Sequence, residues 1–331
     1  MSTVRHRWLS AAAAVLAILG TGVNQAKAED TIKIGILHSL SGTMAISETI
    51  LKDLMLMEVA DVNAKGGLLG KKIEPVVVDP ASNWPLFAEK ARELLVKDKV
   101  AAVFGCWTSV SRKSVLPVFE ELNGLLFYPL EYEGEEASYN IFYGSSVPDN
   151  KAVPAVEYLM SKEGGEVKRF VLEGTDYVYP RTSNKIIRAY LKSRGVKDED
   201  IMENYTPFGF SDPKRVTNDP MESAYILFHM WVQAVQQAGT TDVEAVRQAM
   251  IGQRVRSPSG FEVVMGSNHH MAKPVMIGEI QADGQFSIVH QSKALPPKAW
   301  SPYVEANKGK VADWSWPWVC GGCTSPRFAA D

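Results

Sequence analysis

The stretch Gly105–Gly134, GCWTSVSRKSVLPVFEELNGLLFYPLEYEG, decides the fold of this chain. It follows Val100–Phe104, VAAVF, a continuous apolar run typical of a strand that is covered on both faces. Gly105 interrupts the run, a helical pattern continues to about residue 123, and Leu125–Phe127 returns to strand-forming residues. The order strand, loop, helix, strand predicts an open α/β sheet.

Polar and aromatic side chains fill the loop between the first strand and the helix. Ser109 or Ser111 can cap the helix, and the free N–H groups of its first turn attract a carbonyl oxygen or an anion. Ligands of open α/β sheets bind beside the carboxyl ends of the strands. We therefore expect Trp107, Thr108 and Ser109 to face a binding crevice, together with Tyr128 at the end of the next strand. An ordinary loop with a packed tryptophan is the alternative.

The first part of the chain repeats this alternation. Ile32–Leu37 and Ile73–Val78 read as strands, and a long amphipathic helix between them ends near residue 64. Asn83 can cap the next helix, which has Pro85 in its first turn and runs to Asp98. Alternating strands and helices through residue 130 predict a doubly wound parallel sheet.

A second lobe is expected after Glu131. Phe170–Glu173 is an apolar strand, and the loop that follows it carries Tyr177 and Tyr179. Two residues apart on an extended segment, both rings would point to one side and form one wall of the site. An aromatic mini-core is the alternative. Farther along, helices are predicted at 221–238 and 242–250 and a hairpin at 275–290.

The N-terminus has the pattern of a secretory signal peptide. Arg5 and Arg7 precede an apolar stretch, and Ala26-Lys27-Ala28 is a small-x-small cleavage site. Removing residues 1–28 takes away three of the 35 basic residues and none of the 38 acidic ones, so the formal charge goes from −3 to −6. This mildly acidic balance gives no indication of binding to nucleic acid or to an anionic membrane.

The chain has three cysteines. In an oxidising compartment Cys320 and Cys323, in a CGGC stretch, favour a disulfide, and the surrounding tail lacks the helix of a thioredoxin-like pair. Cys106 is expected to be a small buried side chain. The sequence predicts no metal site, since the adjacent histidines His269 and His270 lie in a polar turn and point apart.

Several stretches closely resemble the urea-binding subunit of bacterial ABC transporters. They are HSLSGTMAISE, VVVDPASNWPLFAEKARELL, the opening stretch through Glu136, TDYVYPRTSNKI, RVTNDPMESAY and KPVMIGEIQADGQF. The chain is more distantly similar to the amide-binding sensor of amidase operons and to branched-chain amino-acid receptors. This resemblance implies the type I periplasmic binding protein fold, with two doubly wound parallel-sheet α/β lobes, hinge strands between them and the ligand enclosed by both. It implies that Trp107, Ser109, Tyr128, Tyr177 and Tyr179 line a small-amide pocket.

Two departures from the family pattern stand out. Leu130 occupies a position where the amide sensor has a polar residue. Asp212 adjoins Pro213, whereas in the family roughly a hundred residues separate the matching segments, so we expect a truncated second lobe that buries little of its sheet. The expected domains are the signal peptide 1–28, a first lobe 29–130, an incomplete second lobe with hinge crossings 131–275, and a C-terminal hairpin and Trp/Cys tail 276–331.

The resemblance implies a periplasmic substrate-binding protein that captures urea or a short-chain amide and delivers it to the permease of an ABC transporter. An amide-sensing regulatory protein is one alternative, although that sensor is cytoplasmic and this chain carries an export signal. An exported amidase is another. Ser109 has no histidine nearby in sequence, no G-x-S-x-G occurs, and His38 stands alone in its loop. We expect no enzyme, no cofactor and no membrane insertion after the signal peptide is cleaved.

Overall fold

The computed structural model describes residues 31–206, 219–281 and 286–304. Two parallel sheets carry the architecture, one with five strands and one with two, and antiparallel strands follow toward the C-terminus. The signal peptide, the Asp212/Pro213 junction and the Trp/Cys tail with Cys320 and Cys323 lie outside the described residues.

The five-stranded sheet is parallel throughout, with strand order β2-β1-β3-β4-β5. Its strands are β1 (Ile32–Leu37), β2 (Ile73–Val78), β3 (Val103–Gly105), β4 (Leu126–Tyr128) and β5 (Ile141–Tyr143). The strand order reverses between β1 and β3, and this switch point is where open α/β sheets bind ligands. The predicted doubly wound parallel sheet is therefore confirmed.

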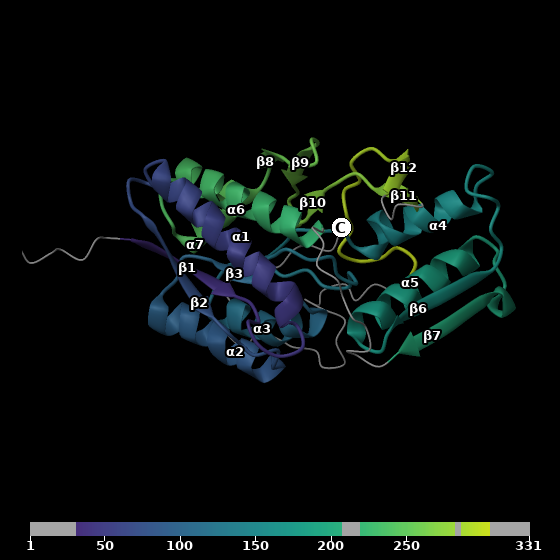
Figure 1. Ribbon diagram of the computed structural model, residues 1–331, viewed down its shortest axis with the longest axis horizontal. Helices are drawn as coiled ribbons and strands as arrows, with labels where there is room; N and C mark the ends of the chain where they lie inside the picture. Colours follow the sequence, from purple (N-terminus) through teal and green to yellow (C-terminus); the bar gives the residue numbers. More distant parts are fainter. Residues whose placement is uncertain (1–30, 207–218, 282–285, 305–331) are drawn as a thin grey trace, which may run out of the picture. The chain divides into compact units, whose positions relative to one another are not determined.

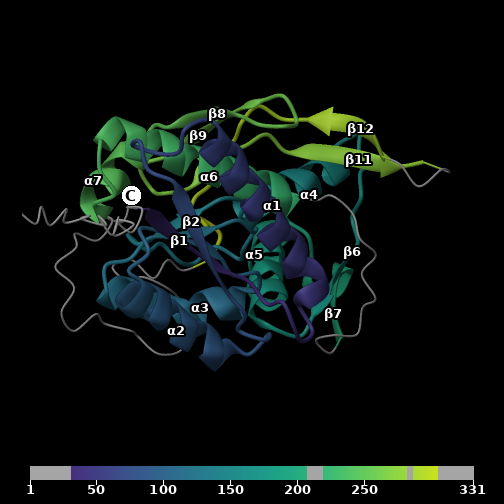
Figure 2. The same ribbon diagram turned by 60° about the vertical axis from the view of Figure 1, so that its left-hand side comes forward.

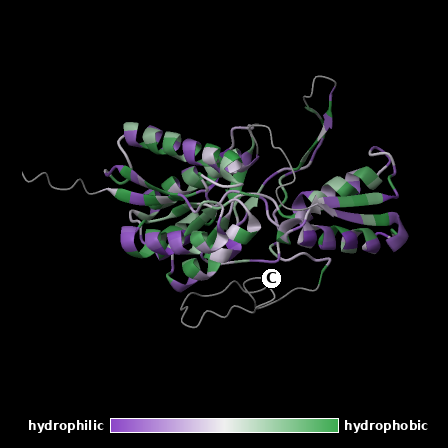
Figure 3. Ribbon diagram, turned by 60° about the horizontal axis from the view of Figure 1, so that its bottom comes forward, coloured by the Kyte–Doolittle hydropathy of each residue, from purple (hydrophilic) through white to green (hydrophobic). Residues whose placement is uncertain are grey.

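Helices cover both faces of this sheet. They are α1 (Ala45–Ala64), α2 (Trp84–Arg92) with a π-helical extension Glu93–Asp98, α3 (Ser109–Glu121), α6 (Asp219–Ala238) and α7 (Val243–Met250). Helix α1 contacts α6, and α2 contacts α3, so one pair lies on each face (Figures 1 and 2). The helices carry both hydrophilic and hydrophobic residues in Figure 3, as expected for elements between a sheet and water. We call this layered unit the first lobe.

Alternation along the short strands sends side chains to separate cores. Phe104, Phe127 and Phe142 stack across β3, β4 and β5 on the side of α6, with ring centroids 4.9 and 5.0 Å apart. Val103 and Leu126 point to the other side, into the core of α2 and α3. Strands of this kind need no polar face, because both of their faces are buried.

The smaller parallel sheet pairs β6 (Phe170–Thr175) with β7 (Ile201–Thr206). Helices α4 (Ala152–Met160) and α5 (Val178–Ser193) complete this unit, which we call the second lobe. Its core is small, formed by four buried residues and the partly buried side chains around them: Phe170, Leu172, Leu191 and Ile201. On the opposite face of the strands, Val171 and Met202 are 64% and 60% exposed.

The remaining described strands are antiparallel. They are β8 (Arg254–Arg256), β9 (Glu262–Met265) and β10 (Met271–Ala272), followed by the hairpin of β11 (Met276–Ile280) and β12 (Phe286–Gln291). The predicted hairpin is confirmed, and His290 of β12 lies beside Tyr158 of α4, with ring centroids 5.2 Å apart. Within the described ranges, no helix combines the length and the apolarity that crossing a membrane requires.

The structure differs from the expected domain boundary at residue 130. Strand β5 pairs in register with β4, so the first sheet continues beyond that residue. Helix α6, expected in the second lobe, buries Ile226, Phe228 and Trp231 in the core of the first sheet. The predicted boundary followed the order of the sequence, but the chain returns to the first lobe after β7. Local sequence patterns do not indicate which sheet a helix covers.

Candidate functional site

The loop after β3 is held in one conformation by its backbone. A Cβ atom at Gly105 would lie 2.3 Å from the carbonyl oxygen of Leu37, so only glycine fits there. Cys106 follows with φ +66°, in the left-handed region, and its side chain is fully buried. Burial raises the pKa of the Cys106 thiol, which agrees with its prediction as a small buried side chain.

Thr108 is the residue that caps α3. Its Oγ1 accepts the backbone N–H of Ser111 at 3.1 Å, and its backbone is extended. The predicted caps, Ser109 and Ser111, lie one and three residues too late, and all three residues have a suitable hydroxyl. Since Thr108 caps the helix, the hydroxyl of Ser109 is available for a different contact.

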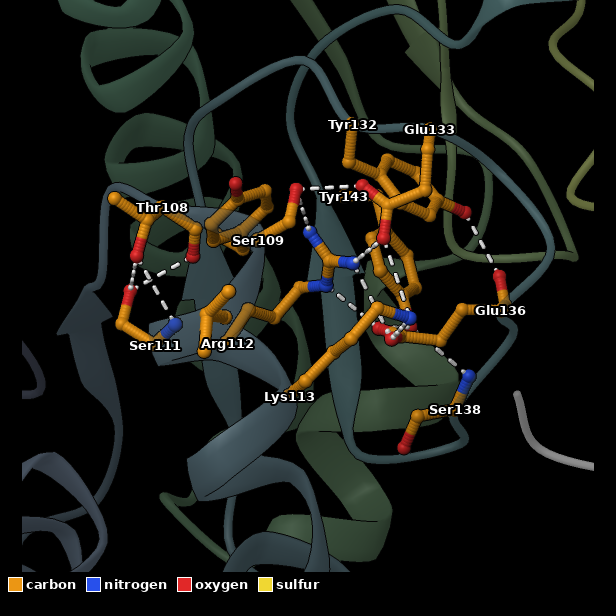
Figure 4. A network of polar contacts seen from close by, with 12 residues as sticks. Thr108, Ser109, Ser111, Arg112, Lys113, Tyr132, Glu133, Glu136, Ser138 and Tyr143 are labelled. Atoms are coloured by element: carbon orange, nitrogen blue, oxygen red, sulfur yellow. Dashed lines mark hydrogen bonds and ion pairs between the residues drawn. The ribbon is translucent and has the colours of Figure 1, made fainter. Parts of the chain in front are cut away.

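That contact is with a buried carboxylate. The Ser109 hydroxyl donates to Oε2 of Glu133 at 2.5 Å, within the range of charge-assisted hydrogen bonds (Figure 4). Oε1 of Glu133 accepts from Nη2 of Arg112 at 3.1 Å and lies 3.2 Å from Nζ of Lys113. Both nitrogens also contact Glu136, and Nε of Arg112 donates to it at 2.7 Å. We call Arg112, Lys113, Glu133 and Glu136 the buried charge cluster.

The buried charge cluster is balanced, with two cations and two carboxylates. Burial by itself would raise the pKa of Glu136, but the charges of Arg112 and Lys113 outweigh burial and lower that pKa to about 2. The pKa of Glu133 is lowered for the same reasons. Buried ion pairs are stable only when their remaining hydrogen-bonding positions are satisfied. Here Tyr143 donates to Glu136 at 2.9 Å, and Ser109 donates to Glu133.

Aromatic rings enclose the guanidinium group of Arg112. Its Cζ lies 4.8 Å from the centroid of Tyr128 and 4.5 Å from that of Tyr132, within cation–π distance. The Tyr128 hydroxyl donates to the carbonyl oxygen of Trp107 at 2.8 Å. Tyr128 is buried, which raises the pKa of its phenol well above the usual value, while Trp107 is half-buried. The structure thus joins Trp107, Ser109 and Tyr128 at the carboxyl ends of β3 and β4.

Tyr177 and Tyr179 lie at the start of α5, with ring centroids 6.4 Å apart. The predicted extended segment is wrong, because the helix begins at Val178 and Tyr177 is its N-cap residue. Both rings are half-buried. Burial, together with the nearby charges of Glu133 and Glu131, raises the pKa of Tyr177 to about 12. The second-lobe tyrosines therefore lie within electrostatic reach of the first-lobe carboxylates.

The buried charge cluster was not predicted from the sequence. Arg112 and Lys113 lie in the first turns of α3, where charged side chains are usually solvated, and Glu133 and Glu136 lie in the following loop. The sequence held one indication of this cluster: the charges of Glu133 and Glu136 are opposite to those of Arg112 and Lys113 in α3. Nothing in the spacing indicated that all four are buried.

The two histidines expected in a polar turn are buried instead. His269 stacks on Phe142 at 4.2 Å and His270 on Tyr143 at 4.4 Å, so the adjacent side chains follow the two faces of β5. Burial lowers the pKa of His269 to about 3 and that of His270 to about 4. The hydroxyl of Tyr132 lies 2.6 Å from Nε2 of His270. In the part of the chain that the structure describes, no group of three or more His, Cys, Asp or Glu residues could hold a metal ion.

A second polar cluster joins three segments that connect the lobes. Nζ of Lys273, between β10 and β11, contacts Oδ1 of Asp219 at 2.5 Å and Oγ of Ser223 at 3.2 Å. Asp219, at the start of α6, also accepts from the hydroxyl of Ser145, which follows β5. The pKa of Asp219 is lowered, since the charge of Lys273 outweighs burial. Side chains from the three connecting segments therefore meet at one point.

Comparison with known proteins gives the class to which this fold belongs. The sequence profile of the periplasmic binding protein domain matches residues 32–216 and 210–306. The match covers more than half of the chain, and the chain belongs to this family. Its α/β fold with parallel sheets is that of type I periplasmic binding proteins.

Particular relatives are similar over part of the chain. The Leu/Ile/Val-binding protein homolog 7 of Brucella melitensis is 30% identical over 141 residues, 41% of this chain and 35% of the relative. The chain thus spans about a third of the length of the curated relatives it matches. A leucine-binding protein from Thermotoga maritima is 14% identical with a TM-score of 0.65 over 79% of this chain and 98% of that chain. A solute-binding protein from Rhodopseudomonas palustris in complex with p-hydroxybenzoic acid is 16% identical with a TM-score of 0.66, covering 81% and 98%.

Proposed function

We propose that this protein is a periplasmic solute-binding protein that captures urea or a short-chain amide between its two lobes and delivers it to the permease of an ABC transporter. Three observations support the proposal: membership of the periplasmic binding protein family, the export signal pattern of residues 1–28, and the polar and aromatic residues at the carboxyl ends of β3 and β4. The proposed ligand-binding residues are Trp107, Thr108, Ser109, Tyr128, Tyr177 and Tyr179.

The observation that carries the choice of a neutral ligand is the charge balance behind the site. A carboxylate ligand is best held by a cation or by several hydrogen-bond donors. Arg112 and Lys113 are the cations beside Ser109, and both contact the carboxylates of Glu133 and Glu136. Recruiting either cation to a ligand would leave a buried carboxylate without its partner, which costs several kcal/mol. A neutral ligand avoids this cost.

Urea is a small planar molecule with one acceptor and four N–H donors. It has little apolar area, so tight binding needs stacking and complete hydrogen bonding in a site without water. The half-buried rings of Trp107, Tyr177 and Tyr179 are suited to stacking, and the hydroxyls of Ser109 and Tyr128 are suited to polar contacts. We propose that ligand binding selects a closed arrangement of the lobes, with the hinge at the Ser145, Asp219 and Lys273 cluster.

One exposed face of the second-lobe sheet is relevant to the expected internal deletion at Asp212/Pro213. Strands of parallel sheets are normally covered on both faces, whereas one face of β6 and β7 exposes Val171 and Met202. A missing segment after β7, at the Asp212/Pro213 junction, would account for the uncovered face. We therefore propose that the internal deletion removed elements that once lay over it.

A second candidate ligand is a carboxylic acid. The relatives are named for leucine and one was solved with p-hydroxybenzoic acid. The first turn of α3 favours an anion, because its N–H groups and the helix dipole carry partial positive charge. This alternative requires the helix terminus alone to hold the carboxylate, since the neighbouring cations are already paired.

Isothermal titration calorimetry of the purified protein separates the two candidates. We expect heat of binding with urea or acetamide and none with leucine or 4-hydroxybenzoate at the same concentrations, with circular dichroism to confirm folding. Binding of leucine or 4-hydroxybenzoate without urea or acetamide would replace the amide proposal with the carboxylate one. A folded protein that binds none of the four would contradict both.

Trp107→Ala tests whether the indole contacts the ligand. We expect the affinity for urea to fall at least about tenfold, because stacking and enclosure are lost, while the melting temperature changes little for a half-buried loop side chain. Trp84→Ala is the matched control, because Trp84 is an exposed tryptophan at the start of α2. Equal urea affinity in Trp107→Ala and the unaltered protein would remove Trp107 from the site.

A further inference from the structure

The direction of one hydrogen bond fixes what Ser109 offers to a ligand. Glu133 is buried, and Arg112 and Lys113 hold it in its ionised form. An ionised carboxylate has no proton, so the hydroxyl of Ser109 must be the donor in their 2.5 Å contact. With its proton committed to Glu133, Ser109 can only accept a hydrogen bond from another partner.

We infer that Glu133 is a specificity-determining positioning residue, which turns Ser109 into an acceptor and so selects ligands with N–H groups over carboxylates. This inference rests on the proposed function, because it assigns Ser109 to the ligand. Glu133 acts through Ser109 in this scheme, because its carboxylate is fully buried and contacts Ser109, Arg112 and Lys113.

Ser109 is buried, and its hydrogen bonds leave one acceptor position of its oxygen for this role. A hydroxyl oxygen has two acceptor positions. Nη1 of Arg112 lies 3.5 Å from the Ser109 oxygen, at the outer limit of a hydrogen bond, and occupies at most one of them. Tyr128 behaves in parallel, because its proton is donated to the carbonyl oxygen of Trp107. The buried hydroxyl oxygens of Ser109, at the start of α3, and of Tyr128, at the end of β4, thus keep acceptor lone pairs, which match the amide nitrogens of urea.

Geometry predicts what Glu133→Gln would do. The cations Arg112 and Lys113 both approach Oε1 of Glu133, whereas Ser109 approaches Oε2. In the glutamine variant the carbonyl oxygen would stay beside the cations, and the NH₂ group would take the position facing Ser109. The amide would then donate to Ser109, and the Ser109 proton would turn outward. The substitution replaces one carboxylate oxygen with an NH₂ group. Ser109 then offers a hydrogen-bond donor to the ligand in place of an acceptor.

Acetamide and acetate are suitable probes, because they have nearly the same shape. Acetamide has an NH₂ group at the position where acetate has its second oxygen. Calorimetry measures the affinity of the protein for acetamide. A competition titration, in which acetate displaces bound acetamide, measures the affinity for acetate. We expect Glu133→Gln to shift the ratio of the two affinities toward acetate by at least about tenfold, as for the reversal of one hydrogen bond to a polar ligand group. An unchanged ratio would overturn the inference.

Glu136→Gln is the matched control. It removes one negative charge from the same buried charge cluster. The described contacts of the Glu136 carboxylate are with Arg112, Lys113 and Tyr143, and not with Ser109. Both glutamine variants are expected to lower the melting temperature, and only Glu133→Gln is expected to change the affinity ratio by tenfold. Equal shifts in the two variants would assign the effect to lost charge and overturn the role of hydrogen-bond direction.

Ser109→Ala keeps all four charges and covers the case in which Glu133→Gln does not fold. We expect acetamide to bind about tenfold more weakly, because its acceptor is lost, and acetate to bind no more weakly than before. Unchanged acetamide affinity in Ser109→Ala would overturn the inference. If the unaltered protein binds neither acetamide nor urea, the proposed function fails first, and this result is distinct from binding without a change in selectivity.

Discussion

The two parallel sheets of this protein differ in how they are covered. In the first lobe, helices bury both faces of five strands, and Phe104, Phe127 and Phe142 stack through the middle. In the second lobe, two strands have one covered face, and Val171 lies exposed on the other. Because hydrophobic burial is the main source of stability, most of the folding free energy lies in the first lobe.

This difference bears on the proposed binding site. Trp107, Ser109 and Tyr128 extend from the well-buried sheet and are fixed by hydrogen bonds to residues of the same lobe. Tyr177 and Tyr179 extend from the start of α5, on the lobe with the small core. Regions with few buried apolar contacts open locally at lower free energy. We expect the first-lobe half of the site to be formed before ligand arrives and the second-lobe half to be ordered by it.

The largest expected effect compares core truncations in the two lobes. Phe127→Ala removes a buried ring from between two others and should lower the free energy of unfolding by about 3–5 kcal/mol. Leu172→Ala removes a side chain from the four-residue core and should destabilise mainly the second lobe, by about 2 kcal/mol. Hydrogen exchange followed by mass spectrometry measures protection in β1–β5 and in β6–β7 separately.

For Leu172→Ala, faster exchange is expected in β6 and β7 while β1–β5 keep their protection. Loss of protection in β1–β5 equal to that in β6–β7 would show that the lobes unfold as one unit, and the comparison would then be wrong. Guanidinium chloride is the suitable denaturant for the matching equilibrium curves, because urea is the proposed ligand.

A smaller effect is expected for the pH dependence of stability, which has opposite signs for two carboxylates, Glu136 and Asp149. The pKa of Glu136, in the first lobe, is lowered to about 2, so its stabilising contribution is lost as pH falls from about 4 toward 2. Burial raises the pKa of Asp149 to about 6; it lies in the turn Pro148–Asn150, which contacts α4 and α5 of the second lobe. Its ionisation opposes folding, so stability is lost as pH rises from about 4 to about 6.

Asp149→Asn should therefore stabilise the protein at pH 7 by about 1 kcal/mol, a rise of roughly 2–4 °C in melting temperature, and leave stability at pH 4 nearly unchanged. An amide oxygen can still accept the N–H of Lys298, which Oδ2 of Asp149 accepts at 3.1 Å. Melting curves between pH 4 and pH 8 make the measurement. The same slope in the variant and in the unaltered protein would show that Asp149 is not the group responsible.

The smallest expected effect concerns the uncovered face itself. Val171→Thr changes a side chain that is largely in water, so the free energy of unfolding should change by less than about 0.5 kcal/mol. Val103→Thr, the same substitution on fully buried β3, should cost more than about 1 kcal/mol because it buries a hydroxyl. Guanidinium unfolding of both variants gives the values. Equal costs would mean that the face bearing Val171 is covered in solution.

Local signals predicted local structure well. Asn83 caps α2 with Oδ1 accepting from Leu86 at 3.0 Å, and Pro85 lies in the first turn, as the sequence indicated. The strands Ile32–Leu37 and Ile73–Val78 have the predicted bounds. Two local predictions were wrong. Thr108 caps α3 in place of Ser109 or Ser111, all of which have a suitable hydroxyl, and Tyr177 occupies the N-cap position of α5 where an extended segment was expected.

The sequence by itself determined the alternation of strands and helices and the placing of Trp107 to Ser109 at a strand end. Periodicity, caps and turns act over about four residues, so they can be read from neighbours along the chain. Only the tertiary structure decided that Ser109 donates to Glu133, 24 residues away, and that Tyr132 meets His270, 138 residues away. Such contacts depend on burial and on which distant groups share a low-dielectric interior. A charged residue has the same local pattern whether it is solvated or paired in the core.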